Sequence, residues 1–190
     1  LEPVAVVEGE VACPFPGLVA FGRGDAAHYF GRVSELDHVV EALRRAPLIP
    51  IAGPSGVGKS SFVTAAVAPR LEESGAWTTV RCRPGATPFA SLAAALDYGD
   101  AAELRAEPTR VALALAACAQ RAKRRVLLVV DQFEECFTLA GDEGVALCAA
   151  LAEAARADEP WRVVLTVRDD FLARLASVPA VRRHLGALVM

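Results

Sequence analysis

The segment GPSGVGKS at residues 53–60 constrains the fold of this chain more than any other stretch. It follows the apolar run 48–51 and precedes the helix-forming SSFVTAAVA, so it connects a strand to a helix. Its glycines let backbone N–H groups close around an anion, while Lys59 offers a charge to phosphate and Ser60 a hydroxyl to Mg²⁺. This pattern predicts a phosphate-binding P-loop. The contact residues are Gly53, Pro54, Ser55, Gly56, Val57, Gly58, Lys59, Ser60 and Ser61.

A glycine-rich turn that binds nothing is the alternative interpretation of this segment, and lysine usage argues against it. Only Lys59 and Lys123 are lysines among the 20 basic residues, and the rest are arginines. A chain that avoids lysine has therefore placed one where the larger, more rigid guanidinium does not fit.

Length, composition and charge limit the classes of protein that this chain can belong to. The 190 residues are enough for one domain with a sizeable core, and a net charge of −3 gives no footprint for nucleic acid or an anionic membrane. The five cysteines are scattered without a C-x-x-C pair, which predicts buried thiols in a reducing cytoplasm. No apolar run is long enough to span a bilayer.

We expect residues 1–13 to be a linker or tag and residues 14–190 to be a P-loop domain within a longer protein, because the chain does not begin with Met. Strand-like runs at 77–82, 125–130 and 161–167 alternate with helix-like segments. A helix with Ser34 as its N-cap precedes the first strand, 98–106 is predicted to be a polar loop, and 185–190 has the pattern of a fifth strand. Strands that alternate with helices predict an α/β fold with a parallel sheet.

Acidic residues directly follow the apolar strand 125–130. Asp131 ends this strand, where a P-loop protein needs a carboxylate to hold Mg²⁺ together with Ser60. Glu134 and Glu135 come three and four residues later, so a helical turn would bring them back toward Asp131. Carboxylates placed in this way serve as metal ligands or as bases that orient water, although a solvated acidic turn is the alternative. We favour Glu135 as the base and keep Glu134 as the alternative.

An arginine ends the next predicted strand in the same way. Because the carboxyl ends of parallel strands share one edge, Arg168 is placed to reach a γ-phosphate. The alternative is a surface ion pair with Asp169 or Asp170, and nearby Thr166 is interpreted as structural.

The base of the nucleotide is inferred mainly from an absence in the sequence. The chain contains no Asn and no Asn/Thr-Lys-x-Asp element of the kind that reads guanine, so ATP and ADP are the expected nucleotides. Gly31 and Arg32, ahead of the first helix, are candidate contacts to the adenine. The basic run 121–125 is interpreted as a solvated helix end rather than a nucleic-acid patch.

Several segments together resemble one group of P-loop proteins. They are CPFPGLVAF with HYFGR, GPSGVGKSSF, VVDQFEECFTL and VVLTVRDDF, in this order over about residues 13–190. They are similar to the STAND-class NTPases, and most of all to the bacterial group called novel STAND NTPase 1. The resemblance implies a three-layer fold related to AAA+ ATPases, with strand order 5-1-4-3-2. It also implies that Asp131 is the Walker B Asp, Arg168 the sensor-1 Arg and Arg32 part of a Gly-Arg element near the base.

The same resemblance implies a signalling switch. In such proteins ADP holds a closed monomer, whereas ATP and a ligand on a C-terminal WD40 or TPR repeat domain favour an oligomer. Many carry an N-terminal effector domain and act in bacterial regulation or antiphage defence. We therefore expect a slow, Mg²⁺-dependent ATPase that self-associates in the full-length protein, with the winged-helix region of the family following residue 190. Two other hypotheses stay open: an AAA+-like ATPase acting on DNA, and a degenerate scaffold, which the intact Lys59, Ser60 and Asp131 oppose.

Overall fold

A computed structural model describes residues 31–187 and Val189; the predicted linker 1–13 and the landmarks before residue 31 lie outside these described residues. The described part forms a four-stranded parallel sheet of order β1-β4-β3-β2. Its strands are β1 (Leu48–Gly53), β2 (Trp77–Cys82), β3 (Arg125–Val130) and β4 (Trp161–Arg168). Val189 forms a parallel bridge to Ile51 of β1. This bridge occupies the place of the fifth strand in the expected order 5-1-4-3-2.

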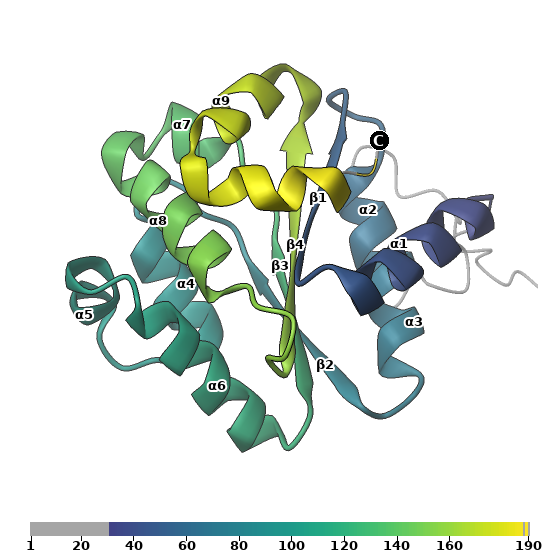
Figure 1. Ribbon diagram of the computed structural model, residues 1–190, viewed down its shortest axis with the longest axis horizontal. Helices are drawn as coiled ribbons and strands as arrows, with labels where there is room; N and C mark the ends of the chain where they lie inside the picture. Colours follow the sequence, from purple (N-terminus) through teal and green to yellow (C-terminus); the bar gives the residue numbers. More distant parts are fainter. Residues whose placement is uncertain (1–30, 188, 190) are drawn as a thin grey trace, which may run out of the picture.

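Helices cover both faces of the sheet, so the domain has the three predicted layers (Figure 1). One face carries α1 (Val33–Arg45) and the helix that follows the P-loop. That helix runs through α2 (Lys59–Phe62), a π-helical segment (Val63–Val67) and α3 (Ala68–Glu72). The other face carries α4 (Pro88–Leu96), α5 (Ala101–Ala106), α6 (Arg110–Ala122), α7 (Glu135–Thr138), α8 (Gly141–Ala154) and α9 (Leu172–Ser177), with 3₁₀ segments at Asp169–Phe171 and Pro179–Ala187.

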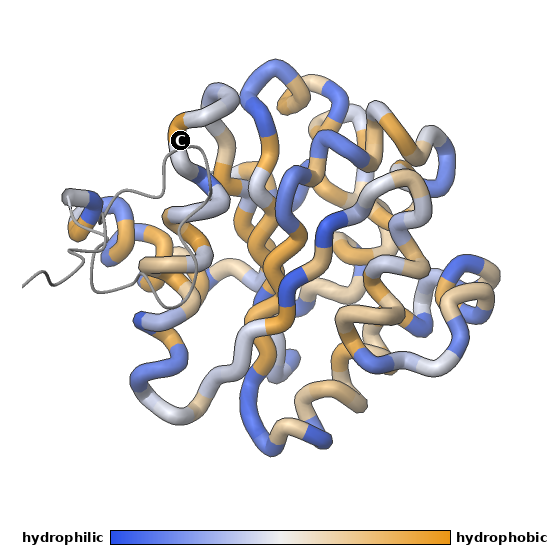
Figure 2. Tube along the Cα trace, turned by 180° about the vertical axis from the view of Figure 1, so that it is seen from behind, coloured by the Kyte–Doolittle hydropathy of each residue, from blue (hydrophilic) through white to orange (hydrophobic). Residues whose placement is uncertain are grey.

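The sheet separates two hydrophobic cores, because successive strand residues point to opposite faces. Leu128 and Val130 of β3 pack with α4, α6 and α8, whereas Leu127 and Val129 pack with α1 and the P-loop helix. Since both faces are covered, β1, β3 and β4 are almost entirely buried and consist mostly of apolar residues. Figure 2 shows these hydrophobic strands through the middle of the molecule.

Two local predictions were wrong. The N-cap of α1 is Arg32, and the Ser34 hydroxyl instead donates to Glu35 Oε2 at 2.8 Å. The predicted polar loop 98–106 contains α5, which begins after Asp100, whose Oδ1 accepts a hydrogen bond from the Ala102 amide at 2.7 Å. Both errors concern helix starts, where short polar side chains have several competing backbone partners.

The P-loop helix is continuous over Lys59–Glu72, as predicted, but it widens into a π-helical turn before Pro69. Proline has no amide hydrogen, and in a regular α-helix its ring clashes with the carbonyl four residues earlier. The wider turn at Val63–Val67 accommodates Pro69 within the helix.

β2 is the edge strand of the described sheet, and α3 covers part of its edge. The Thr79 amide donates to Glu72 Oε1 at 2.9 Å. The carboxylate at the end of α3 therefore satisfies a backbone donor in the middle of the edge strand.

α7 and α8 pack so closely that one position permits only glycine. A Cβ added to Gly144 would lie 1.9 Å from the carbonyl oxygen of Cys136 and 2.5 Å from its carbonyl carbon. No side chain fits at these distances. Gly144 therefore lets α8 support α7, which carries Glu135 and directly follows Glu134.

Candidate nucleotide-binding site

The glycine-rich segment connects β1 to α2 at the carboxyl edge of the sheet (Figure 1). Gly56 and Gly58 have φ angles of 78° and 88°, in the left-handed region that favours glycine. Lys59 Nζ donates to the carbonyl oxygens of Gly53 at 2.7 Å and Pro54 at 2.8 Å, so its side chain bridges the two ends of the loop. The helix that begins at Lys59 directs its N-terminal amides toward the loop. This is the geometry of an anion-binding P-loop.

The structure brings Ser60 and Asp131 into direct contact. Ser60 Oγ donates to Asp131 Oδ1 at 2.7 Å, and Asp131 is 9% exposed. A hydroxyl and a carboxylate are the hard oxygen ligands that Mg²⁺ prefers, so the pair fits the predicted metal site. Within residues 31–187 and Val189, no group of three or more His, Cys, Asp or Glu side chains could hold a metal. A Mg²⁺ ion here would therefore take its remaining ligands from water and phosphate.

Thr166, which the sequence analysis interpreted as structural, positions Asp131. Its Oγ1 donates to Asp131 Oδ1 at 2.5 Å and accepts from the Gln132 amide at 2.9 Å, while its carbonyl accepts from the Phe133 amide at 2.8 Å. Gln132 needs this support because its φ of 55° is unusual for a residue with a Cβ. Only the pairing of β3 with β4 reveals this role, since it aligns Val130 with Leu165.

Glu134 and Glu135 lie in the predicted helical turn but contact different partners. Glu135 is 8% exposed and accepts hydrogen bonds from Arg83 Nε at 2.8 Å and the Gly85 amide at 3.1 Å. These contacts hold it against the loop after β2. Glu134 Oε2 instead accepts from the Arg168 amide at 3.3 Å.

The contact between Glu134 and the Arg168 amide places Glu134 on the P-loop side, because β4 pairs Arg168 with Gly53. Partial burial lowers the pKa of the Lys59 ammonium, and the strongest opposing influence is the charge of Glu134, followed by Asp169. Because Arg83 and the Gly85 amide hold Glu135, Glu134, the alternative left open by the sequence, becomes our candidate for the base.

Arg168 lies beside the first P-loop residue, because β4 pairs it with Gly53. Its Nε and Nη2 donate to the two carboxylate oxygens of Asp170 at 3.0 and 2.7 Å. Of the two alternatives considered for this side chain, the structure shows the surface ion pair. Arg168 still lies close enough to Lys59 that its charge contributes to the lowered pKa of that ammonium.

Arg32 joins the segment before α1 to the P-loop. Its Nη2 donates to the Val57 carbonyl at 2.8 Å, and its guanidinium carbon lies 5.9 Å from the centre of the Phe62 ring. Gly31 precedes it with a φ of 96°. The predicted Gly-Arg element therefore borders the loop.

Comparison with protein families identifies Novel STAND NTPase 1 over residues 14–190, which includes every site residue described above. The chain belongs to the Novel STAND NTPase 1 family. Members of this family are P-loop NTPases, so the loop, Asp131 and the strand order belong to a P-loop NTPase module.

A solved ATPase structure shares the fold of this novel STAND NTPase, and a second structure matches it less well. A Walker-type ATPase of Pyrococcus abyssi is 17% identical with a TM-score of 0.56, covering 87% of this chain and 51% of that one. A Rhizobiales Trip13 structure is 18% identical with a TM-score of 0.44, covering 85% and 48% of the two chains. The chain thus spans about half the length of these proteins. A search of curated proteins found no match.

Two further arginines of the novel STAND NTPase contact the acidic residues of the site. Arg81 lies near the end of edge strand β2, and Arg83 directly follows that strand. Arg81 Nη2 lies 3.3 Å from Asp131 Oδ2, and Arg83 pairs with Glu135. Sequence interpretation did not single out either residue, although the pattern Arg-Cys-Arg at a strand end was visible.

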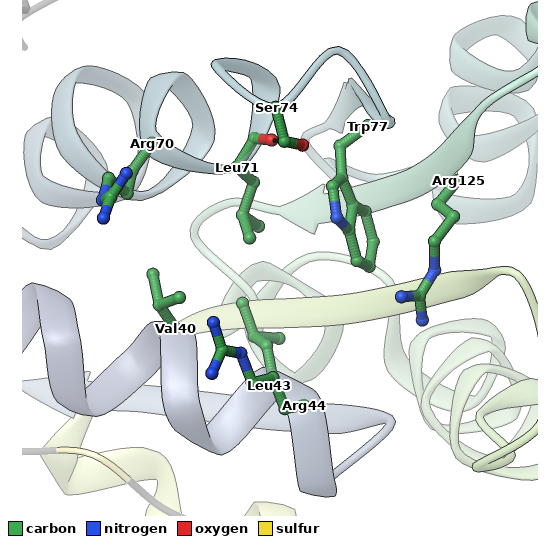
Figure 3. A pocket seen from close by; sticks show the side chains of 8 residues that line it. All are labelled: Val40, Leu43, Arg44, Arg70, Leu71, Ser74, Trp77 and Arg125. Atoms are coloured by element: carbon green, nitrogen blue, oxygen red, sulfur yellow. Dashed lines mark hydrogen bonds between the residues drawn. The ribbon is translucent and has the colours of Figure 1, made fainter.

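A hollow of about 250 Å³ lies at the edge of the sheet opposite the P-loop (Figure 3). Leu43 of α1, Leu71 of α3 and Trp77 of β2 line it, and the Arg125 guanidinium carbon lies 4.2 Å from the centre of the Trp77 ring. Because β2 and β3 begin at Trp77 and Arg125, this is the amino edge. The hollow is therefore separate from the P-loop site.

Cys82, Cys136 and Cys148 are buried free thiols, as predicted, and Cys118 is half-buried. Burial raises the pKa of the Cys82 and Cys148 thiols to about 12, which suppresses their reactivity. Among the helices of the described residues, none combines the length and apolarity needed to cross a membrane.

Proposed function

We propose that this domain binds ADP and ATP with Mg²⁺ and hydrolyses ATP slowly, so that the bound nucleotide sets its conformational state. The observation that carries the proposal is the 2.7 Å hydrogen bond between Ser60 and Asp131 beside the Lys59-bridged loop. This contact supports the proposal, because a Mg²⁺–phosphate complex needs a hydroxyl, a carboxylate and an ammonium close together. The absence of Asn and of a guanine-reading element supports adenine over guanine.

Each residue has a separate role in this proposal. The loop amides and Lys59 bind the phosphates, while Ser60 and Asp131 hold the metal and Thr166 keeps the Asp131 carboxylate in place. Bound Mg²⁺ supplies charge neutralisation at the phosphates. Glu134 orients water and accepts its proton, because it contacts the Arg168 amide beside the loop while Glu135 is held by Arg83.

Replacement of Lys59 by alanine is expected to weaken ADP and ATP binding about a hundredfold, because the loop loses its point charge. Isothermal titration calorimetry of the chain in Mg²⁺ measures this change. Lys123→Ala, which removes the only other lysine from the end of α6, is the matched control and should bind like wild type. Tighter binding of GTP than of ATP would overturn the adenine assignment.

We expect this domain alone to turn over ATP more slowly than about 1 s⁻¹, the low end of typical enzymes. In this proposal the domain contacts the phosphates from the P-loop side only, and Arg168 is engaged by Asp170. An arginine supplied from another subunit or domain is worth ~10³–10⁵ in rate in P-loop enzymes, so slow turnover follows from its absence.

Phosphate release by purified protein, with Lys59→Ala as blank, measures this turnover. Hydrolysis faster than about 1 s⁻¹ that does not depend on protein concentration would show a self-sufficient enzyme. It would contradict the proposal that the bound nucleotide sets the conformational state.

The biological setting is part of the same proposal. Slow hydrolysis keeps a nucleotide state long enough to bias assembly, so we propose that the full-length protein self-associates under control of its nucleotide. A C-terminal WD40 or TPR sensor and an N-terminal effector, acting in bacterial regulation or defence, complete this scheme. The buried free thiols support a cytoplasmic location.

A further inference from the structure

The two carboxylate oxygens of Asp131 have different environments. Oδ1 accepts hydrogen bonds from Ser60, Thr166 and the Gln132 amide. Oδ2 faces Arg81, whose Nη2 lies 3.3 Å away. The candidate metal carboxylate is therefore already paired with a cation of this chain.

Arg81 reaches Asp131 from the side of the sheet where the P-loop helix lies. In the parallel pairing of β2 with β3, Arg81 is level with Val129, and Val129 packs in the core beneath α1 and the P-loop helix. Paired residues of neighbouring strands point to the same face, so the Arg81 side chain extends over that face toward Ser60 and Asp131.

The Arg81–Asp131 ion pair is partly buried, and Arg81 pairs with no second carboxylate of the described residues. The exposed fractions of the two side chains are 45% and 13%. Within the described residues, Arg81 has no other carboxylate within 4.0 Å, in contrast with Arg83, which pairs with Glu135. Among the described residues, the ion-pair partner of Arg81 is thus Asp131, the candidate metal carboxylate.

We propose that Arg81 is a resident counter-ion of Asp131 that competes with Mg²⁺ and allows this site to hold a nucleoside diphosphate without metal. The inference rests on the proposed nucleotide binding. A guanidinium beside Asp131 offsets the repulsion between its carboxylate and phosphate oxygens, so metal-free ADP is tolerated. The same guanidinium repels a dication, so Arg81 weakens the attraction of the site for Mg²⁺.

Arg81→Gln tests this role, because it keeps a polar side chain and removes the charge. The dissociation constant of a fluorescent ADP analogue is measured in EDTA and in saturating Mg²⁺, and the Mg²⁺ concentration for half-maximal tightening is titrated. We expect the ratio of the EDTA and Mg²⁺ dissociation constants to rise about tenfold over wild type, and the Mg²⁺ midpoint to fall. Arg81→Lys should restore most of the wild-type ratio.

Arg70→Gln is the control for charge alone, because Arg70 is an exposed arginine of α3 paired with Glu73. It should leave the ratio unchanged. An unchanged ratio in Arg81→Gln would overturn the counter-ion role, and so would equal weakening in both conditions, which would indicate a direct nucleotide contact. If the wild type binds no ADP even with Mg²⁺, the proposed function itself fails, and the two failures are therefore distinguishable.

Discussion

Glu134→Gln is expected to lower the single-turnover rate of ATP hydrolysis by ~10²–10⁴, the usual contribution of a general base. ADP affinity should change by less than about twofold, because a base acts on water rather than on the bound diphosphate. The reason for choosing Glu134 is its position, because it accepts from the Arg168 amide and Arg168 pairs with Gly53 of the P-loop. Rapid-quench measurement with enzyme in excess over ATP separates this step from binding and product release.

Glu135→Gln is the matched control, since it makes the same change one residue away. This variant is expected to lower the stability of the fold, because the side chain that holds Arg83 and the Gly85 amide loses its charge. We expect a decrease of about 1 kcal/mol in the free energy of unfolding and a smaller effect on turnover. If Glu135→Gln alone abolished hydrolysis in a fully folded protein, Glu135 would be the base and our assignment would be wrong.

Gly144→Ala is expected to destabilise the domain by at least about 3 kcal/mol, at the upper end for overpacking. The added methyl would meet the backbone carbonyl of Cys136 at 1.9 Å, and backbone atoms cannot rotate away as a flexible side chain can. α8 must therefore move away from α7. Urea unfolding followed by circular dichroism measures the shift, with an unchanged m-value showing that stability alone has altered.

Gly99→Ala provides the comparison for this variant. Gly99 is exposed, its φ is not in the left-handed region, and a Cβ there would meet nothing within 4 Å. Its stability should stay within about 0.5 kcal/mol of wild type, as for ordinary surface substitutions. Equal stability of Gly144→Ala and wild type would show that α7 and α8 separate without cost. The position of Glu134 would then not depend on that contact.

The features that were predicted from sequence are those encoded within short segments. The P-loop depends on the spacing from Gly53 to Ser60, and β3 is a run of apolar residues because both of its faces are covered. Asp131 follows directly from the end of that strand. Parallel strand order was also predicted correctly, by family resemblance.

The features that were missed depend on which strands become neighbours. Arg81 is 50 residues from Asp131 and Thr166 is 35 residues from it, so only the pairing of β2, β3 and β4 brings them together. The contact that bears on the choice between Glu134 and Glu135 likewise comes from Arg83, at the end of another strand. No periodicity in a single segment contains this information.

The Glu72–Thr79 hydrogen bond limits how copies of this protein can assemble. The Cys82 carbonyl accepts from the Asp131 amide, so alternate residues of β2 pair with β3, and Thr79 directs its amide outward. An incoming strand would have to displace the Glu72 carboxylate from that amide and then tolerate the charged end of β2 at Arg81. Extension of the sheet from copy to copy is therefore blocked on this flank. In the assembly that we propose to be under nucleotide control, copies would therefore meet at surfaces other than this edge of β2.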